Sequence, residues 1–332
     1  MSGTLVRLRS AGRGKLSQEQ LVALVVVALF VAFGVALDGF LTVNNLVNLV
    51  RSVSSLGIFG VAMAVVVIAR GMDLSLIASM GVATAVAIQL MRTPVSTPVA
   101  LLAGFGVVLI MGLFNGFLIA FVEIPALFAT LASGLLVYGL ARTTILDGLI
   151  AELPGDRHFV LALGQGTLFG IPVPIIVFAV VALLAQLMLS RTKSGRFIYA
   201  HGDNAGAAAL TGISVRPFTI LEYLGSATIG FIGGLVTAGA VGGLNTQVID
   251  SSLIYDVLLV VVVGGISLVG GRGSVASVVV GTALIGVMLN GMTILNMNNH
   301  EQDIVKGLIL LAALVLDNRL HPRDEETVRQ GD

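Results

Sequence analysis

The stretch from Arg191 to Gly212, RTKSGRFIYAHGDNAGAAALTG, decides the fold, because it is polar, basic and rich in glycine between two apolar runs. Residues 172–190 before it and 217–241 after it each come close to, or exceed, the roughly 20 apolar residues that cross a bilayer. A hydrophilic segment inside a membrane protein must face water, and its basic residues indicate which side that water is on. The stretch therefore predicts a membrane protein with a hydrophilic centre that faces the cell interior.

The composition of the whole chain agrees with a location in lipid. Of its 332 residues, 56% are hydrophobic and only 11% are charged, whereas soluble domains carry about 25% charged residues. The formal net charge is +0, which gives no indication of a nucleic-acid partner. The chain has 0 cysteines, which excludes disulfides, thiol catalysis and cysteine-ligated metals.

The apolar segments predict an all-α, polytopic helical bundle with about ten transmembrane helices. They run over 20–39, 52–69, 74–91, 99–121, 126–141, 172–190, 217–241, 253–270, 274–293 and 302–317. The second and third are separated only by residues 70–73, so we expect a broken helical path there. The transmembrane domain is thus 20–317, with tails at 1–19 and 318–332.

The distribution of basic residues orients this frame. With the N-terminus inside, the outer segments hold only Arg51, Arg92, Arg142 and Arg157, and most other basic residues fall inside. Shifting the frame by one helix would put the basic 191–216 loop outside and break the positive-inside rule. We therefore predict that both termini and this loop are cytoplasmic. Segment 142–171 is then extracytoplasmic, either as an ordinary exposed loop, the interpretation that we favour, or as a docking surface for a partner.

Two patterns of small residues bear on packing. Gly230, Gly234, Ala238 and Gly242 recur every four residues, which favours close packing inside the bundle over a subunit interface. Segment 113–116 resembles 288–291 at an offset of five spans, as in transporters with inverted repeats. A second likeness, between 71–75 and 265–268, does not fit that offset.

No catalytic or metal-binding set is present in the sequence. The four histidines, at 158, 201, 300 and 321, lack the HExxH spacing of zinc enzymes. The segment from Gly12 to Lys15 lacks the first glycine of a phosphate-binding loop. If ATP powers this protein, another chain must bind the ATP.

A few polar residues lie in the apolar background. Asp73, with Ser75, either lines a solute path or caps a helix at the inner interface, and both interpretations stay open. Asn115 and Asn290 either hydrogen-bond a solute hydroxyl or bridge helices. We expect Asp256 to lie on a solvated outer rim rather than to form part of a site, and Lys306 to pair locally with Glu301 and Asp303.

Four sequence blocks, in order, carry a resemblance to a known family. VVVIARGMDLS at 65–75 resembles a hydrophobic run followed by GGIDLS, and 112–116 with Ile124-Pro125 and Thr130-Leu131 resembles GLxNGxLI…IPxFIxTL. Segment 194–200 with Gly202, Asn204, Ala207 and Gly212-Ile213 resembles GRxIYAIGGNxxAA…GI. Segment 264–268 with Gly270, Gly271, Gly273 and Asn290-Gly291 resembles GGTSLxGGxG…NG. Over about 40–317 the chain resembles the permease subunits of ABC importers for ribose, xylose, arabinose and galactose, distant relatives of branched-chain amino acid permeases.

This resemblance implies a set of partners in a bacterial inner membrane. Two permease chains, identical or paralogous, form the path, and an extracytoplasmic binding protein delivers a monosaccharide. ATP and Mg bind to separate ATP-binding subunits, so this chain is not an enzyme and has no cofactor. Those subunits dock on the inner loop, for which the resemblance indicates Gly195, Arg196, Gly202, Asp203, Asn204, Ala207 and Gly212.

The residues of this loop support the docking role. The alanine-rich run 204–210 predicts a short helix with Asp203 or Asn204 as its N-cap. We expect Gly195, Gly202, Gly206 and Gly212 to permit tight turns.

The chain also departs from the family pattern. Arg70 replaces the first glycine of GGIDLS and is expected to reach the inner surface or to pair with Asp73. Ile254 replaces a glutamate before the GG motif. These changes leave open a nucleoside or sugar-like signal as solute. An ion-coupled secondary carrier is the alternative from another class, with Asp73 as its only good carboxylate.

Overall fold

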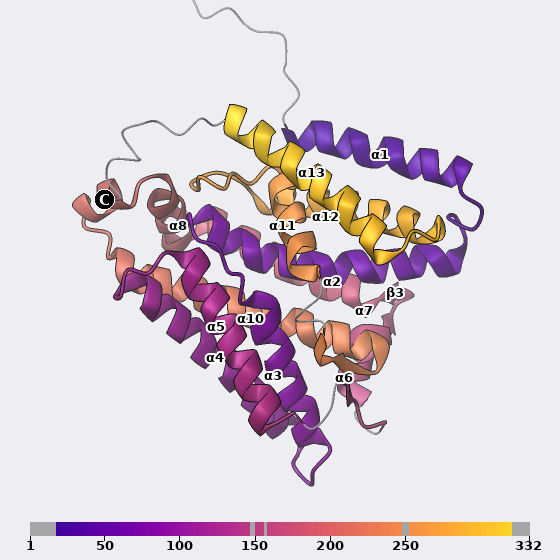
Figure 1. The fold of residues 1–332 in the computed structure, drawn as a ribbon, viewed down its shortest axis with the longest axis horizontal. Coiled ribbons are helices and arrows are strands. Elements are labelled where there is room, and N and C mark those ends of the chain that lie inside the picture. Colours follow the sequence, from indigo (N-terminus) through magenta and orange to yellow (C-terminus); the bar gives the residue numbers. More distant parts are fainter. Residues whose placement is uncertain (1–17, 147–149, 156–157, 248–251, 321–332) are drawn as a thin grey trace, which may run out of the picture.

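A computed structural model describes residues 18–146, 150–155, 158–247 and 252–320 (Figure 1). The two tails and Arg157 thus lie largely or wholly outside the described residues. The helices are α1 (Gln18–Ala36), α2 (Val43–Ile68), α3 (Leu76–Met91), α4 (Thr97–Ala120), α5 (Ala126–Thr144), α6 (His158–Gln165), α7 (Val173–Arg191), α8 (Lys193–Asp203), α9 (Ala205–Leu210), α10 (Val215–Val241), α11 (Leu253–Gly264), α12 (Val275–Ile294) and α13 (Asn299–Leu320). The strands are β1 (Ile150–Glu152), β2 (Thr167–Leu168), β3 (Ile171–Pro172) and β4 (Gly243–Asn245).

Each of the ten predicted apolar segments has a helix in its place: α1 to α5, α7 and α10 to α13. Seven helices of the described chain are long and apolar enough to cross a membrane, namely α1, α2, α4, α5, α7, α10 and α12. The predicted total of ten is larger, because α3 has 16 residues, α11 has 12, and α13 is more polar. The seven helices indicate a multi-pass membrane protein.

The two short helices adjoin breaks in the helical path, and the breaks touch each other. The predicted break after α2 is confirmed: Arg70 has a φ of +67°, and α3 begins only at Leu76. A second break follows α11, where Gly270 and Gly271 have positive φ angles. The backbone N–H of Gly271 donates to the carbonyl of Ile68 (2.8 Å), so the end of α2 is held by the second break. The sequence likeness between 71–75 and 265–268 corresponds to these two adjacent breaks.

The packing of the long helices supports the inverted-repeat interpretation. Helix α10 packs against α3 and α4, whereas α2 packs against α11 and α12, and the two long helices also pack against each other (Figure 1). A five-span offset relates α2, α3 and α4 to α10, α11 and α12. Helices α2 and α10 therefore each pack against two helices of the opposite half, which ties the halves together.

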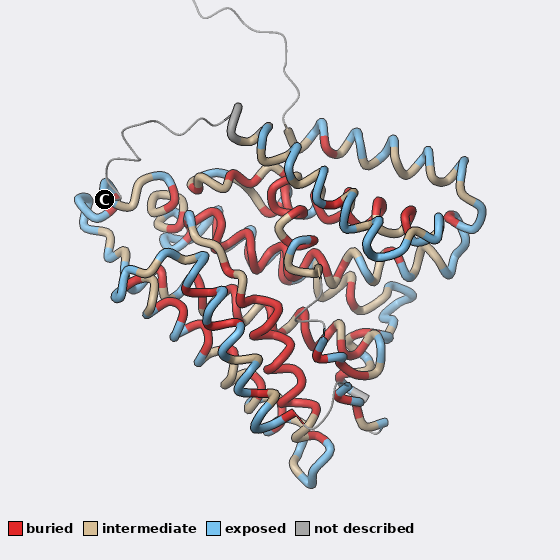
Figure 2. Tube along the Cα trace, in the orientation of Figure 1, coloured by how far each residue is buried: buried red, intermediate tan, exposed pale blue. Residues whose placement is uncertain are grey.

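Burial follows the same arrangement. Helix α3 is buried along nearly its whole length, whereas Val22 is the only buried residue in α1 (Figure 2). The predicted small-residue stripe does pack within the bundle. A Cβ on Gly230 would lie 2.6 Å from Leu76 Cδ1, and one on Gly234 would lie 2.4 Å from Thr84 Oγ1. Gly242 has a different role, because its φ of +75° ends α10.

Segment 142–171 is not the ordinary exposed loop that we favoured. Strand β1 pairs antiparallel with β4, and α6 packs against α10. A Cβ on Gly164 would lie 1.9 Å from the backbone nitrogen of Ala240, and one on Gly239 would lie 2.1 Å from the carbonyl oxygen of Val160. These two glycines allow the two helix backbones to touch, which fixes the segment to the end of α10.

Candidate coupling element and solute path

The central hydrophilic stretch forms two consecutive helices, α8 and α9. Thr192 is the N-cap of α8, and its Oγ1 accepts from the backbone N–H of Gly195 (3.1 Å). Asn204 is the N-cap of α9, and its Oδ1 accepts from the backbone N–H of Ala207 (2.9 Å). The predicted short helix and its Asn204 cap are confirmed. Residues 193–203, which were expected to be a loop, are helical as well.

The glycines of this stretch have two different functions. Gly212 has a φ of +86° and makes the predicted turn. The tight turns expected at Gly195, Gly202 and Gly206 are wrong, because all three residues lie in helices. Gly195 and Gly202 allow close backbone approach instead. A Cβ on Gly202 would lie 1.9 Å from the carbonyl oxygen of Ile68 and 2.6 Å from the backbone nitrogen of Gly271. Helix α8 is thus pressed directly onto both breaks.

Further contacts attach α8 to the second break and leave one face free. The Tyr199 hydroxyl donates to the carbonyl of Gly273 (2.8 Å), and Asp203 lies against Gly271. Arg196, Asp203 and Ala207 are exposed. Leu210, at the end of α9, is 92% exposed, which is a high value for a large apolar side chain.

A second line of contacts runs from α8 through α10 to the first break. His201 Nδ1 lies 3.1 Å from Glu222 Oε1, and Glu222 is only 3% exposed. The next residue, Tyr223, donates its hydroxyl to the carbonyl of Met72 (3.3 Å). The sequence reasoning missed Glu222, although an acidic residue inside the apolar run 217–241 was a visible signal.

The first break holds a buried polar cluster around Asp73. Ser75 Oγ and Ser226 Oγ donate to the two oxygens of Asp73 (2.7 and 3.0 Å), and Asn115 Nδ2 donates to Ser75 Oγ (2.8 Å). Ser133 on α5 donates to Asn115. Asp73, Ser75 and Asn115 are each at most 2% exposed, and together they bridge the start of α3 to α4, α5 and α10.

This geometry supports a local structural role for Asp73 just before α3, although the N-cap residue of that helix is Ser75. The backbone N–H of Ser75 also donates to Asp73 Oδ1 (3.1 Å) at the start of α3. Burial raises the pKa of Asp73 above its ordinary value, although the hydrogen bonds from Ser75 and Ser226 lower it. Arg70 is exposed, and Asp73 takes its hydrogen bonds from serines rather than from that arginine.

Asn290 lies in a different polar region. It exchanges amide hydrogen bonds with Asn45 on α2 (3.0 and 2.9 Å). Both asparagines line a cavity of about 860 Å³ between α2, α11, α12 and α13, and neither Asp73 nor Asn115 lines it. The structure therefore brings three of the four predicted path residues together and leaves Asn290 apart.

The α2 wall of this cavity was missed by the sequence reasoning. Asn45, Asn48, Ser52 and Ser55 follow one another at spacings of three and four, so they share one helix face, and all four line the cavity. The second span was expected to begin at residue 52, which left half of this polar face outside the helix. The spacing of three and four residues between these polar side chains was the signal in the sequence for a polar helix face.

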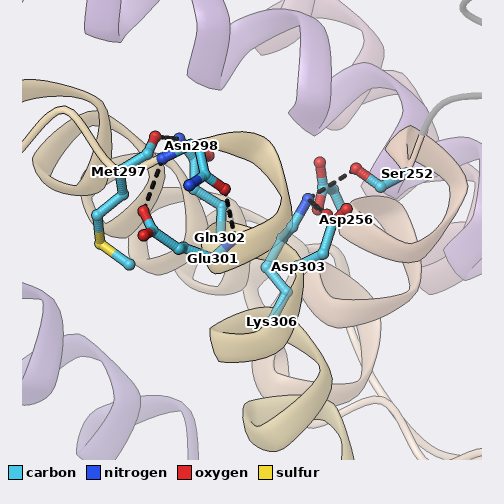
Figure 3. A network of polar contacts seen from close by, with 8 residues as sticks. All are labelled: Ser252, Asp256, Met297, Asn298, Glu301, Gln302, Asp303 and Lys306. Carbon is cyan, nitrogen blue, oxygen red and sulfur yellow. Dashed lines mark hydrogen bonds and ion pairs between the residues drawn. The ribbon is translucent and has the colours of Figure 1, made fainter.

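On the opposite wall, Lys306 is at the centre of an ionic cluster (Figure 3). Its Nζ lies 2.9 Å from Asp303 Oδ1, as predicted, and also 3.0 Å from Asp256 Oδ1 and 2.7 Å from Ser252 Oγ. The solvated rim predicted for Asp256 is wrong, because this residue is 8% exposed and faces the lysine.

The predicted pairing of Lys306 with Glu301 is also wrong. Five positions separate the two residues, so they lie on different faces of α13. Glu301 instead accepts from the backbone N–H of Asn298 (2.8 Å), whose Oδ1 accepts from the backbone N–H of Glu301 (3.0 Å). This reciprocal cap starts the helix. In the described part of the chain, no group of three or more histidines, aspartates or glutamates is placed to hold a metal ion.

Comparison with known proteins agrees with this arrangement. Residues 45–314 match the family model described as the branched-chain amino acid transport system permease component. The chain belongs to this family of ABC permeases. The permease is 34% identical to the L-arabinose transport system permease protein of Escherichia coli (strain K12) over 321 residues, which cover 95% of each chain. It is 29% identical to the ribose import permease protein of the same strain over 305 residues, 92% of this chain and 94% of the relative.

A ribose import permease protein of Bacillus subtilis (strain 168) is 29% identical over 280 residues, 84% of this chain and 86% of the relative. No solved structure matches the chain. The resemblance to simple-sugar ABC permeases is therefore confirmed.

Proposed function

We propose that this chain is the membrane-spanning subunit of an ATP-driven, binding-protein-dependent importer for a monosaccharide. ATP and Mg bind to separate subunits that dock on α8 and α9 from the cytoplasm of a bacterium. A second permease chain, identical or paralogous, completes the path, and an extracytoplasmic binding protein delivers the solute. This chain transports and does not catalyse a reaction.

The observation that carries the proposal is the backbone contact between α8 and the two breaks. Gly202 brings α8 against the carbonyl of Ile68 and the backbone nitrogen of Gly271, with no side chain between them. A contact without a flexible side chain transmits displacement well, because packed backbones resist compression. A force applied to α8 therefore reaches the segments where α2 and α11 are already interrupted.

The exposed face of α8 and α9 is suited to binding a partner. Arg191, Lys193 and Arg196 are exposed and supply positive charge, and Leu210 supplies an apolar contact. The ATP-binding subunits close when ATP binds, and closure moves α8 and α9. The free energy of ATP then shifts the populations of inward- and outward-open states.

The test is uptake by the complete transporter in proteoliposomes. The chain is co-purified with its ATP-binding subunits and given the binding protein and labelled ribose or arabinose. Deletion of residues 204–208 should abolish ATP-driven uptake and leave membrane insertion intact, because it removes the Asn204 cap and four of the six residues of α9. Unchanged uptake after the deletion would refute the coupling role. Uptake driven by a proton gradient without ATP-binding subunits would refute the importer and favour a secondary carrier.

A further inference from the structure

The cavity between α2, α11, α12 and α13 has no part in the coupling contacts. It lies along the N-terminal half of α2, whereas α8 is held at the C-terminal end of that helix, at Ile68. Its volume of about 860 Å³ falls within the range of small-molecule sites, roughly 300–1,000 Å³.

The walls of the cavity are polar on two facing helices. The face of α2 described above presents amides and hydroxyls. Helix α13 contributes Asn299, Gln302, Asp303 and Lys306, again at spacings of three and four. Two matched polar faces in an otherwise apolar chain are costly in lipid, so they indicate contact with water or a polar solute.

The charges on the walls indicate which class of solute fits. Lys306 is the only cation among the lining residues of the described chain, and Ser252, Asp256 and Asp303 already surround its ammonium group. No positive group is left for a phosphate or for the carboxylate of an amino acid. Amides and hydroxyls both donate and accept hydrogen bonds, which matches a neutral compound with several hydroxyl groups.

One acceptor in the cavity lacks a hydrogen bond. Asp256 Oδ1 is buried and accepts no hydrogen bond of good geometry, although Lys306 Nζ lies 3.0 Å away. A carboxylate accepts several hydrogen bonds, so its pairing with the ammonium group leaves capacity for a further donor. A solute hydroxyl is a donor of the right size for this position.

We propose that this cavity binds the transported solute as a neutral polyhydroxyl compound, with Asp256 accepting from a solute hydroxyl and the polar faces of α2 and α13 holding the others. Lys306 pairs with Asp256 and holds it in place. The solute class rests on the proposed function, whereas the position of the site rests on the cavity alone.

The absence of cysteine makes the site directly testable. Ser55→Cys places the only thiol of the chain in the cavity. Ser54→Cys, at the neighbouring position, is the matched control. Ser54 is 2% exposed, and its hydroxyl donates to the carbonyl of Val50 (2.7 Å). Each full-length variant in nanodiscs is treated with a small cationic methanethiosulfonate reagent, and labelling is followed by intact mass.

We expect Ser55→Cys to react at least about tenfold faster than Ser54→Cys, and ribose or arabinose to slow its labelling. Leucine and ribose 5-phosphate should give no protection. Equal rates for the two thiols, no protection by any monosaccharide, or protection by leucine would each overturn the proposal.

Two variants in the Ser55→Cys background test the polar contacts. Asp256→Asn and the exposed Asn48→Ala should each raise the sugar concentration for half-protection, by roughly tenfold for Asp256→Asn. Asn48→Ala keeps the test valid if Asp256→Asn does not fold. Unchanged half-protection in Asn48→Ala would overturn the role of the α2 face.

This assay contains neither ATP nor partner subunits, so the two proposals fail separately. Protection by sugar without ATP-driven uptake would refute the importer and keep the site. ATP-driven sugar uptake without protection would refute the site and keep the importer.

Discussion

Gly202→Ala is the sharpest test of the contact between α8 and the two breaks. The added Cβ would lie 1.9 Å from the carbonyl oxygen of Ile68, and real Cβ contacts are essentially never shorter than 3.0 Å. The two backbones must therefore separate by about 1.1 Å, and the second contact, 2.6 Å to the nitrogen of Gly271, prevents a simple sideways shift.

Two opposing effects decide the size of the result. Alanine is favoured over glycine in a helix by roughly 1 kcal/mol, which stabilises α8 by itself. Overpacking against backbone is unfavourable by about 1–3 kcal/mol, and it raises the free energy of the docked state alone. Because both clashes are with backbone atoms, we take the upper end of this range, about 3 kcal/mol. Subtracting the gain of about 1 kcal/mol leaves a net loss of about 2 kcal/mol in docking of α8, which corresponds to a roughly 30-fold lower ATP-driven uptake.

Gly206→Ala is the matched control in the neighbouring helix. Its Cβ would meet only Asn204 Oδ1, at 3.4 Å, and the residue is exposed. Uptake by reconstituted transporter is measured for both variants at equal protein content, together with basal ATP hydrolysis. If Gly202→Ala transports within twofold of the unchanged chain, or if Gly206→Ala loses as much, the contact does not transmit force.

Three further predictions concern stability and topology. Because burial raises the pKa of Asp73, its contribution to stability is greatest at low pH and declines as the pH rises through the raised pKa. Asp73→Asn should therefore reduce the dependence of the thermal unfolding temperature on pH, and an unchanged dependence in this variant would contradict the burial effect. Lys306→Met should lower the free energy of unfolding, measured with denaturant, by about 3 kcal/mol, because it leaves Asp256 without its ion-pair partner. Adding Asp256→Leu should restore most of this loss. Equal stability of the single and double variants would exclude a role for the pair. A reporter fused after Arg196 should be cytoplasmic and one fused after Gly155 should not, since the positive-inside rule orients the frame; the reverse pattern would overturn the orientation.

The positions of the apolar helices could be predicted because hydropathy is a local property. Residues 217–241 read as a membrane helix, and α10 occupies 215–241. The polar helix α8 could not be predicted in the same way. Its sequence, KSGRFIYAHGD, contains two glycines, each unfavourable in a helix by about 1 kcal/mol. Tertiary packing at Gly202 outweighs this cost, and a single sequence does not show that packing.

The candidate site was predictable where its contacts are close in sequence or follow helical spacing. Asp73 and Ser75 are two residues apart, and their hydrogen bond follows from the start of α3. The ion pair of Lys306 with Asp303 follows from an offset of three. Its pairing with Asp256, 50 residues earlier, depends on how α11 packs against α13. The same limit explains why Asn115 and Asn290, which share an Asn-Gly motif, were placed in one path.

Helix α2 joins the two regions physically. It spans 26 residues, so its length is about 39 Å. The C-terminal carbonyl at Ile68 meets α8, and the polar face from Asn45 to Ser55 forms one wall of the cavity. A helix buried at its centre moves as a rigid body, so a displacement imposed at Ile68 must shift that wall relative to α11 and α12. Linkage is reciprocal: a solute that favours one position of α2 must also change the position of α8.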